Sequence, residues 1–303
     1  MAINLPMPGK RFVIGVPYVW LFVFFLLPFL ILLYISFVDM GESINPFKPI
    51  WDSQTGLLSL KYENYWTIFR DEGGELFKTI YIEAYLRSIW YALWTAVLCL
   101  VFGYPFAYFI ARSPASVRPA LLMMVMLPFW TSFLLRVYAW KGILADQGVL
   151  NQLLMAVGIT SEPILMLYTN VSMLVGMTYV YLPFMVLPLY ANLVKMDFRL
   201  LEAAYDLGTT PFKAFWLVTV PLSKAGIIAG FMLVFIPALG EFVIPSLLGG
   251  PENIMIGRVV WDEMFTSNNW PRASALAVVM ILLIIVPLAI YYHYTGDAAE
   301  PRK

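Results

Sequence analysis

The amino-acid sequence predicts an all-α integral membrane protein with six transmembrane helices. Its composition, its charge-free stretches and the placement of its basic residues each support that fold class. Of the 303 residues, 61% are hydrophobic and only 13% are charged, whereas soluble domains usually carry about a quarter charged residues. So few charges leave too little polar surface to keep a folded chain in water, and lipid must therefore cover much of the protein.

Six charge-free stretches mark the expected membrane helices. They are residues 12–38, 88–111, 119–135, 163–194, 225–240 and 273–292, and the fifth stays apolar as far as residue 248. A helix needs about 20 residues to cross a hydrocarbon core of about 30 Å. Each charge at the centre of a span costs about 2.5–3.5 kcal/mol on insertion. We therefore expect one transmembrane helix in each stretch.

Two of these stretches have unusual lengths. The third is short, but it continues past Arg136, whose long side chain can reach the membrane interface. The fourth is long and contains Pro183 and Pro188. Each proline removes a backbone hydrogen bond from a helix, so the fourth stretch predicts a tilted or kinked span.

Basic residues divide unevenly between the two sides of the membrane. With a cytoplasmic N-terminus, the inner segments hold ten Lys and Arg against five acids, and the outer segments hold nine against fourteen. Cytoplasmic loops carry an excess of Lys and Arg, so we expect both termini in the cytoplasm. Residues 1–303 then form a single transmembrane domain, with 39–87 as its longest periplasmic loop and 195–224 as its one sizeable cytoplasmic loop.

Several classes of site have no candidate residues in the sequence. Cys99 is the only cysteine and His293 the only histidine, which excludes an internal disulfide and a multi-histidine metal site. We expect no catalytic residue and no metal ligand. The chain also lacks the Gly-rich phosphate loop of nucleotide-binding proteins, so any nucleotide must bind to a separate subunit.

The cytoplasmic loop 195–224 contains dense signals for helix starts and stops. Asp197 can cap a first helix and Gly208 can end it in the left-handed conformation. Thr210 and Pro211 can start a second helix, and Pro221 can end it before the next span. In the first helix one face is apolar and the other charged; the apolar positions are Leu200, Ala203, Ala204 and Leu207, and the charged ones are Arg199, Glu202 and Asp206. The loop predicts a helix–turn–helix elbow beneath the bilayer, or more simply an amphipathic connector that rests on it.

The spacing within this loop resembles the EAA loop of ABC-type importer permeases. Glu202-Ala203-Ala204 is followed after three residues by Gly208, and after nine more by residues 218–221, Val-Thr-Val-Pro. Val218 and Val220 replace the isoleucine and leucine usual in that family. The resemblance implies that the loop docks into a cytoplasmic ATPase, that Glu202 pairs with a basic residue there, and that the alanines allow a close approach. The docking residues so implied are Glu202, Ala203, Ala204, Asp206, Gly208, Pro211 and Pro221.

Three further segments look like the spermidine/putrescine branch of this family: residues 128–140, 181–188 and 240–250. The resemblance covers nearly the whole chain and implies the type I ABC importer permease architecture in a bacterial inner membrane. It also implies three partners, namely a second related permease subunit in a heterodimer, an ATPase dimer that binds ATP and Mg, and a periplasmic polyamine-binding protein. This chain would then be a non-catalytic subunit that binds no cofactor.

A path for polyamines needs carboxylates or aromatic faces for their ammonium groups. Glu241 is the best carboxylate candidate because it stands within an apolar stretch, although it could simply end the fifth helix at the interface. The aromatic candidates are Trp130, Tyr138, Trp140, Tyr179 and Tyr181, for which an interfacial aromatic belt is the alternative. Arg136 and Arg258 should lie off the path, where they contact the binding protein or cap helices.

Two other function classes were weighed. A stand-alone secondary transporter or channel for small organic cations needs inverted repeats or several buried charges, and the sequence shows neither. A membrane enzyme needs a cluster of titratable residues near one face, which is also lacking. The importer permease is therefore the expected function.

Overall fold

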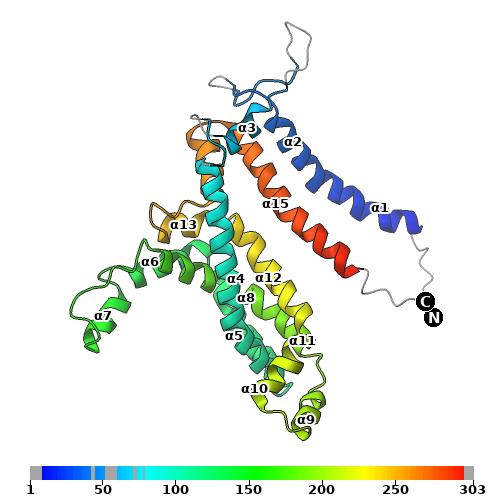
Figure 1. The fold of residues 1–303 in the computed structure, drawn as a ribbon, viewed down its shortest axis with the longest axis vertical. Coiled ribbons are helices and arrows are strands. Elements are labelled where there is room, and N and C mark those ends of the chain that lie inside the picture. The colour runs from blue at the N-terminus through cyan, green and yellow to red at the C-terminus, as the bar shows by residue number, and fades with distance from the viewer. Residues whose placement is uncertain (1–8, 42–44, 52–59, 71–73, 78, 297–303) are drawn as a thin grey trace, which may run out of the picture. The chain divides into compact units, whose positions relative to one another are not determined.

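The computed structural model describes residues 9–41, 45–51, 60–70, 74–77 and 79–296. Within these ranges the chain forms helices and two isolated β-bridges, with no strand, which agrees with the all-α prediction. It divides into two compact units, 1–82 with 259–303 and 83–258. The chain passes from one unit to the other within α4 (Ile80–Arg112), which Figure 1 labels, and within α14 (Ile256–Trp261).

The first unit contains the N-terminal and C-terminal helices. Its elements are α1 (Lys10–Leu21), the π-helical turn η1 (Phe22–Leu26), α2 (Leu27–Ser36), α3 (Glu63–Phe69), the π-helical turn η4 (Asp262–Thr266) and α15 (Trp270–Gly296). Helix α15 packs along α2 and against α3. Most side chains of α1 and η1 are exposed, as expected for a segment that lipid surrounds.

Hydrogen bonds fix α3 to the end of α2. The Asn64 amide donates to the carbonyl oxygens of Ser36 and Val38 at 3.0 and 2.9 Å. The Ser36 and Tyr65 hydroxyls share a hydrogen bond of 2.6 Å. Burial raises the pKa of Tyr65, and this hydrogen bond partly offsets the rise. These bonds satisfy carbonyl groups that the last turn of a helix leaves free.

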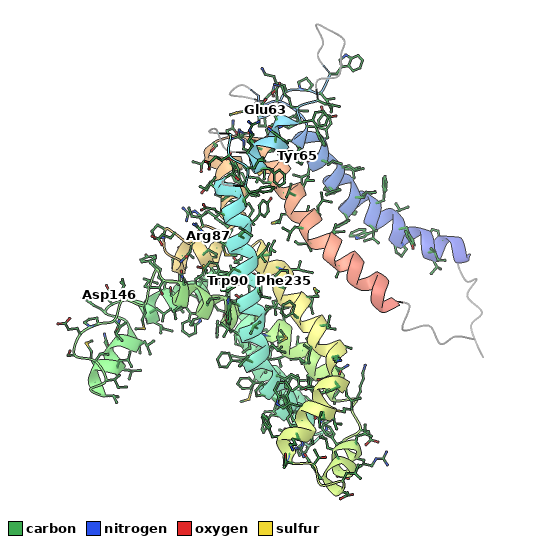
Figure 2. The ribbon with its side chains drawn as sticks, in the orientation of Figure 1. Glu63, Tyr65, Arg87, Trp90, Asp146 and Phe235 are labelled. Carbon is green, nitrogen blue, oxygen red and sulfur yellow. The ribbon has the colours of Figure 1, made fainter. Side chains whose placement is uncertain are left out.

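The predicted loop 39–87 ends earlier than expected, at its C-terminal side. Helix α4 (Ile80–Arg112) already begins at Ile80 and so includes Glu83 and Arg87. These two charges form an i,i+4 ion pair of 3.1 Å on the exposed surface of the helix, and Figure 2 shows Arg87 on this part of α4. Because the pair is compatible with a helix, the charges mark the limit of the apolar stretch and not the limit of the helix.

The second unit contains most of α4 and the remaining helices. They are α5 (Arg118–Met126), the 3₁₀ turn η2 (Leu127–Trp130), α6 (Phe133–Leu144), α7 (Val149–Ala156), α8 (Asn170–Leu193), α9 (Arg199–Asp206), α10 (Pro211–Ala214), the π-helical turn η3 (Phe215–Thr219), α11 (Val220–Leu222), α12 (Lys224–Leu239), α13 (Val243–Leu248) and α14 (Ile256–Trp261).

The membrane spans agree only in part with the six that the sequence predicts. Three described helices are long and apolar enough to cross a membrane: Phe12–Ser36, Ile80–Arg112 and Asn170–Leu193. Two further candidates are bent pairs, Arg118–Trp130 with Phe133–Ala156 at 86° and Pro211–Leu222 with Lys224–Leu239 at 70°. The sixth stretch lies in α15, whose described apolar part is shorter than a full span. The number six and the orientation of the termini remain predictions.

The structure corrects both stretches of unusual length. The third breaks sharply at Thr131 and Ser132, and Arg136 beyond the break is only 8% exposed within this chain. Its guanidinium lies 4.7 Å from the ring centre of Phe129. The fourth begins as a helix only at Asn170, after the capping box of Thr169 and Ser172. Its extra length is therefore partly a non-helical lead-in.

Small residues bring α8 and α12 into close contact. A β-carbon at Gly226 of α12 would lie 2.8 Å from Asn192 Cβ and 3.0 Å from the Pro188 carbonyl oxygen of α8. A β-carbon at Gly230 would lie 2.6 Å from Met185 Sδ. Apolar side chains alone do not drive helices together in lipid, so close approach at small residues is the expected device.

We predict that Gly226→Ala destabilises the protein, whereas Gly142→Ala on α6 stabilises it. Both changes raise helix propensity by about 1 kcal/mol, but nothing lies within 4 Å of a β-carbon at Gly142. Overpacking at Gly226 costs about 1–3 kcal/mol, so we expect a net loss of about 1 kcal/mol in unfolding free energy. Thermal unfolding of the detergent-purified variants measures the difference, and equal shifts would contradict the packing account.

Candidate functional site

The elbow, residues 195–224, begins with an ion pair on its exposed surface. The Arg199 guanidinium donates to both carboxylate oxygens of Asp197, at 2.8–3.1 Å, and the Arg199 amide donates to Asp197 Oδ1 at 3.1 Å. The hydrogen bonds from Arg199 lower the pKa of Asp197. The N-cap of α9 is Phe198 and has no side-chain cap. The N-cap thus lies one residue later than predicted, and Asp197, just before it, accepts from the first amide of the helix.

Helix α9 leaves its apolar stripe uncovered within this chain. The residue that packs inward is Leu201, which is buried, while Leu200 and Ala203 are exposed. Leu207 is 87% exposed at the end of the helix. Glu202 and Asp206 are also exposed, on the charged side. The predicted amphipathic pattern is present, and the apolar stripe is a free surface.

The turn at Gly208 has the conformation that the sequence predicts. Its φ of +80° is left-handed, which favours glycine. The Gly208 amide donates to the Tyr205 carbonyl at 2.8 Å, and the Thr209 amide donates to the Ala204 carbonyl at 3.0 Å. This pair of bonds is the Schellman arrangement that ends a helix.

The second helix of the elbow begins as predicted but ends differently. The Thr210 hydroxyl accepts from the Lys213 amide, and Pro211 occupies the first turn. The chain then continues through η3 and α11, so Pro221 lies inside a helical segment and does not end it. The break comes at Ser223, whose hydroxyl shares a 2.7 Å hydrogen bond with Tyr104 of α4.

Sequence reasoning missed the aromatic contact that fixes the elbow to α4. Phe215 makes edge contacts with Tyr104 and Tyr108, with ring centres 5.3 and 6.1 Å apart. The spacing of Tyr104 and Tyr108 by four residues places both on one face of α4, which was the only signal available. Phe212 and Leu217 of the same segment are exposed, as Leu207 is.

Glu241 lies buried at the break between α12 and α13 and is 9% exposed. Its Oε1 accepts from the amides of Phe242, Val243 and Ile244 at 3.1, 3.0 and 3.4 Å. Its Oε2 accepts from the Tyr181 hydroxyl of α8 at 2.5 Å. The structure therefore brings together two of the predicted path residues, but as hydrogen-bond partners of each other.

The remaining aromatic candidates do not converge on one point. Trp140 and Tyr179 contact each other with ring centres 5.4 Å apart. Trp130 is 76% exposed and Tyr138 is also exposed, and neither has an aromatic contact among the described residues. The Arg136 guanidinium lies over the rings of Phe129 and Phe133, and its Nε and Nη1 atoms have no acceptor within the described residues.

Comparison with models of protein families shows the family to which the chain belongs. The family model of the "binding-protein-dependent transport system inner membrane component" matches residues 103–297. The chain belongs to this family. The matched range begins in α4 and contains the elbow and the Glu241 break, which are the two features described above.

Curated relatives agree with this membership. The spermidine/putrescine transport system permease protein PotB of Haemophilus influenzae is 37% identical over 283 residues, which are 93% of each chain. PotB of Escherichia coli K12 is 39% identical over 222 residues, covering 73% of this chain and 81% of that protein. The inner membrane ABC transporter permease protein YdcU of the same organism is 32% identical, covering 71% and 72%.

Solved structures share the fold. A bacterial ABC transporter involved in import of the acidic polysaccharide alginate superposes with a TM-score of 0.62 at 17% identity, covering 96% of this chain and 97% of the other. The same transporter in complex with an alginate pentasaccharide-bound periplasmic protein gives a TM-score of 0.62 at 18% identity, covering 96% of each chain. At this identity the likeness establishes the fold alone.

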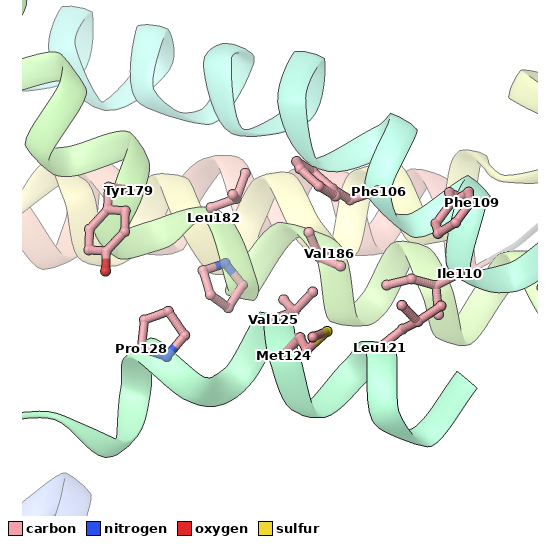
Figure 3. Close-up of a pocket in the computed structure, with 11 residues that line it drawn as sticks. Phe106, Phe109, Ile110, Leu121, Met124, Val125, Pro128, Tyr179, Leu182 and Val186 are labelled. Carbon is pink, nitrogen blue, oxygen red and sulfur yellow. The ribbon is translucent and has the colours of Figure 1, made fainter. Parts of the chain in front are cut away.

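This family member also has an apolar pocket of about 360 Å³ between α4, α5 and α8 (Figure 3). Its lining is Phe106, Phe109, Ile110, Leu121, Met124, Val125, Pro128, Tyr179, Leu182, Pro183 and Val186. No charged residue lines it, and the Tyr179 hydroxyl is its only polar side-chain group. A pocket of this composition suits hydrocarbon and not a polycation.

We predict that Gly208→Val loosens the elbow while Gly208→Asn does not. A β-branched residue at φ +80° is strained by about 1–2 kcal/mol, whereas asparagine visits this region readily. Hydrogen exchange at the Gly208 position and Thr209 should speed up about tenfold in the valine variant. The asparagine variant should stay near wild type. Unchanged exchange in Gly208→Val would show that the turn does not depend on glycine.

Proposed function

We propose that this chain is the membrane-spanning permease subunit of an ATP-binding-cassette importer for polyamines, putrescine or spermidine. The observation that carries the proposal is the 37% identity to a spermidine/putrescine permease over 93% of the chain. Because the similarity extends over 93% of both chains, we propose that the substrate class is shared as well.

The proposal includes the partners and the setting of such an importer. A periplasmic polyamine-binding protein delivers substrate, and the solved alginate transporter bound to a periplasmic protein supports a partner of this kind. A second, homologous permease subunit completes the path as a heterodimer. A cytoplasmic ATPase dimer supplies the energy and holds the ATP and Mg. The chain crosses the bacterial inner membrane six times with both termini in the cytoplasm.

The elbow is the proposed docking element for the ATPase. Its exposed apolar residues Leu207, Phe212 and Leu217 offer a surface that a partner groove can bury. Glu202 is exposed and positioned to pair with a basic residue of that groove. The small side chains of Ala203 and Ala204 allow the partner to approach closely. Gly208 makes the turn, and Asp206 and Pro211 lie on either side of Gly208 in the sequence. Pro221 lies in the helical segment that leads to α12.

Aromatic faces form the proposed contacts along the substrate path. Trp130 and Tyr138 are exposed, and Trp140 and Tyr179 form a separate pair with ring centres 5.4 Å apart. Ammonium groups bind such faces weakly enough to be released. Glu241 and Tyr181, the other two path candidates, already occupy each other's polar atoms. A path contact by this pair requires that the hydrogen bond open.

The test is polyamine uptake by the complete complex reconstituted in vesicles. We predict that Glu202→Lys lowers ATP-dependent spermidine uptake at least tenfold, because a like charge meets the basic residue of the ATPase. Asp146→Lys is the matched control: Asp146 is equally exposed, and it lies in the loop between α6 and α7 (Figure 2). We expect wild-type uptake in the control and normal membrane insertion in both.

Two results would contradict the proposal. Unlabelled putrescine and spermidine should both compete for uptake, while simple organic anions should not, so inhibition by anions alone would remove the polyamine assignment. Uptake by the purified chain without the ATPase would instead favour a stand-alone transporter or channel for small organic cations.

A further inference from the structure

The break between α12 and α13 is held by one carboxylate. Helix α12 ends at Leu239 and α13 starts at Val243, so the amides that open α13 have no partner in the preceding turn. Glu241 supplies one acceptor oxygen to three of these amides. Its negative charge also faces the positive end of a helix. The carboxylate therefore holds the first turn of α13 in place.

The second carboxylate oxygen ties this break to α8. Tyr181 is buried within α8, and its hydroxyl donates to Glu241 Oε2. The far end of α13 is tied to the same helix, because the Ser172 hydroxyl donates to the Leu248 carbonyl at 2.7 Å. Between them, Gly176 lets Leu248 approach so closely that a β-carbon would lie 2.4 Å from its Cδ1. Helix α13 is thus fixed to α8 at both ends.

Helix α8 is packed equally closely against α12, through Gly226 and Gly230. Three helices are therefore joined, α8 with α12 by close packing and α8 with α13 by hydrogen bonds and packing. The elbow connects the C-terminal end of α8 to the N-terminal end of α12. A displacement of the elbow therefore reaches α13 directly through these contacts and the short break at Gly240–Phe242, while α13 also packs against α6.

We propose that Tyr181 and Glu241 are positioning residues for transport, which make α13 follow α8 and α12 when the elbow moves. This inference rests on the proposed function, because it assumes that the ATPase moves the elbow. It assigns Glu241 a task other than binding substrate. The four hydrogen bonds that its carboxylate accepts among the described residues come from three amides and one hydroxyl of its own chain.

Three variants distinguish a positioning role of Glu241 from a substrate-binding role. The two roles predict opposite orders of transport loss for Tyr181→Phe and Glu241→Gln. Glu241→Gln removes the charge but keeps an oxygen for the amides, and its NH₂ group can donate to the Tyr181 hydroxyl. Tyr181→Phe keeps the charge and removes the hydrogen bond. Glu241→Ala removes both. A positioning role makes Tyr181→Phe more damaging than Glu241→Gln, whereas a substrate-binding role makes Glu241→Gln the more damaging.

The experiment measures spermidine uptake and ATP hydrolysis by the complete reconstituted complex. We expect Tyr181→Phe and Glu241→Ala to lower the maximal uptake rate at least fivefold, with KM within twofold of wild type. ATP hydrolysis should continue, so the ratio of uptake to hydrolysis falls. Glu241→Gln should lower the uptake rate and the ratio of uptake to hydrolysis less than Tyr181→Phe does, with KM within twofold of wild type. Tyr190→Phe is the control, because Tyr190 lies on α8 and no side-chain hydrogen bond joins it to the described residues.

A rise in KM above fivefold for Glu241→Gln, or wild-type uptake by Tyr181→Phe, would overturn the inference. Hydrogen exchange of residues 242–244 provides a second measurement that does not depend on transport. It should accelerate in Tyr181→Phe and Glu241→Ala but not in Tyr190→Phe, and equal exchange in all three would also overturn it. If the wild-type complex shows no ATP-dependent polyamine uptake, the proposed function fails, and the exchange measurement still tests the hydrogen bond.

Discussion

Backbone groups freed where a helix breaks must find partners inside the protein, and most features of the second unit follow from this constraint. Hydrocarbon offers no hydrogen bonds, so each unsatisfied amide or carbonyl is costly there. At the break after α12, Glu241 accepts from three amides. At the break after η2, the Thr131 hydroxyl donates to the Pro128 carbonyl at 2.7 Å. The break before α12 lies in the elbow and not in a proposed membrane segment, and there the Ser223 hydroxyl donates to the Val220 carbonyl at 3.1 Å and bonds to Tyr104.

These partners also decide which helices act together. Tyr104 joins the elbow to α4, and Tyr181 joins the start of α13 to α8. The alginate transporter has the same fold at 17% identity.

Much of the fold follows from the sequence, because charge-free stretches and turn residues have direct physical meaning. Gly208, Thr210 and Pro211 predict the turn of the elbow correctly, since each residue satisfies a local backbone requirement. Pro221 does not end its helix, because proline is tolerated in a first helical turn. The sequence could not show the bend after Trp130, because apolar residues continue on both sides of it.

The contacts of the candidate site were harder to predict, because they form only when segments distant in the sequence pack together. Glu241 stands out in the sequence as a charge in an apolar stretch, which indicates a partner but not which one. The partner, Tyr181, is 60 residues away in the chain and appears beside it only after α8 and α12 pack. Arg136 is a similar case, because its burial against Phe129 depends on the bend at Thr131 and Ser132.

The central claim is that a cytoplasmic ATPase binds the elbow, and site-specific photo-crosslinking tests this binding directly. A photoreactive residue in place of Leu207, which points away from the rest of its chain, should crosslink to the ATPase subunit in the purified complex. The same residue in place of Asp146 should not. Crosslinks from position 207 to lipid alone, or to the ATPase from position 146 alone, would contradict the account.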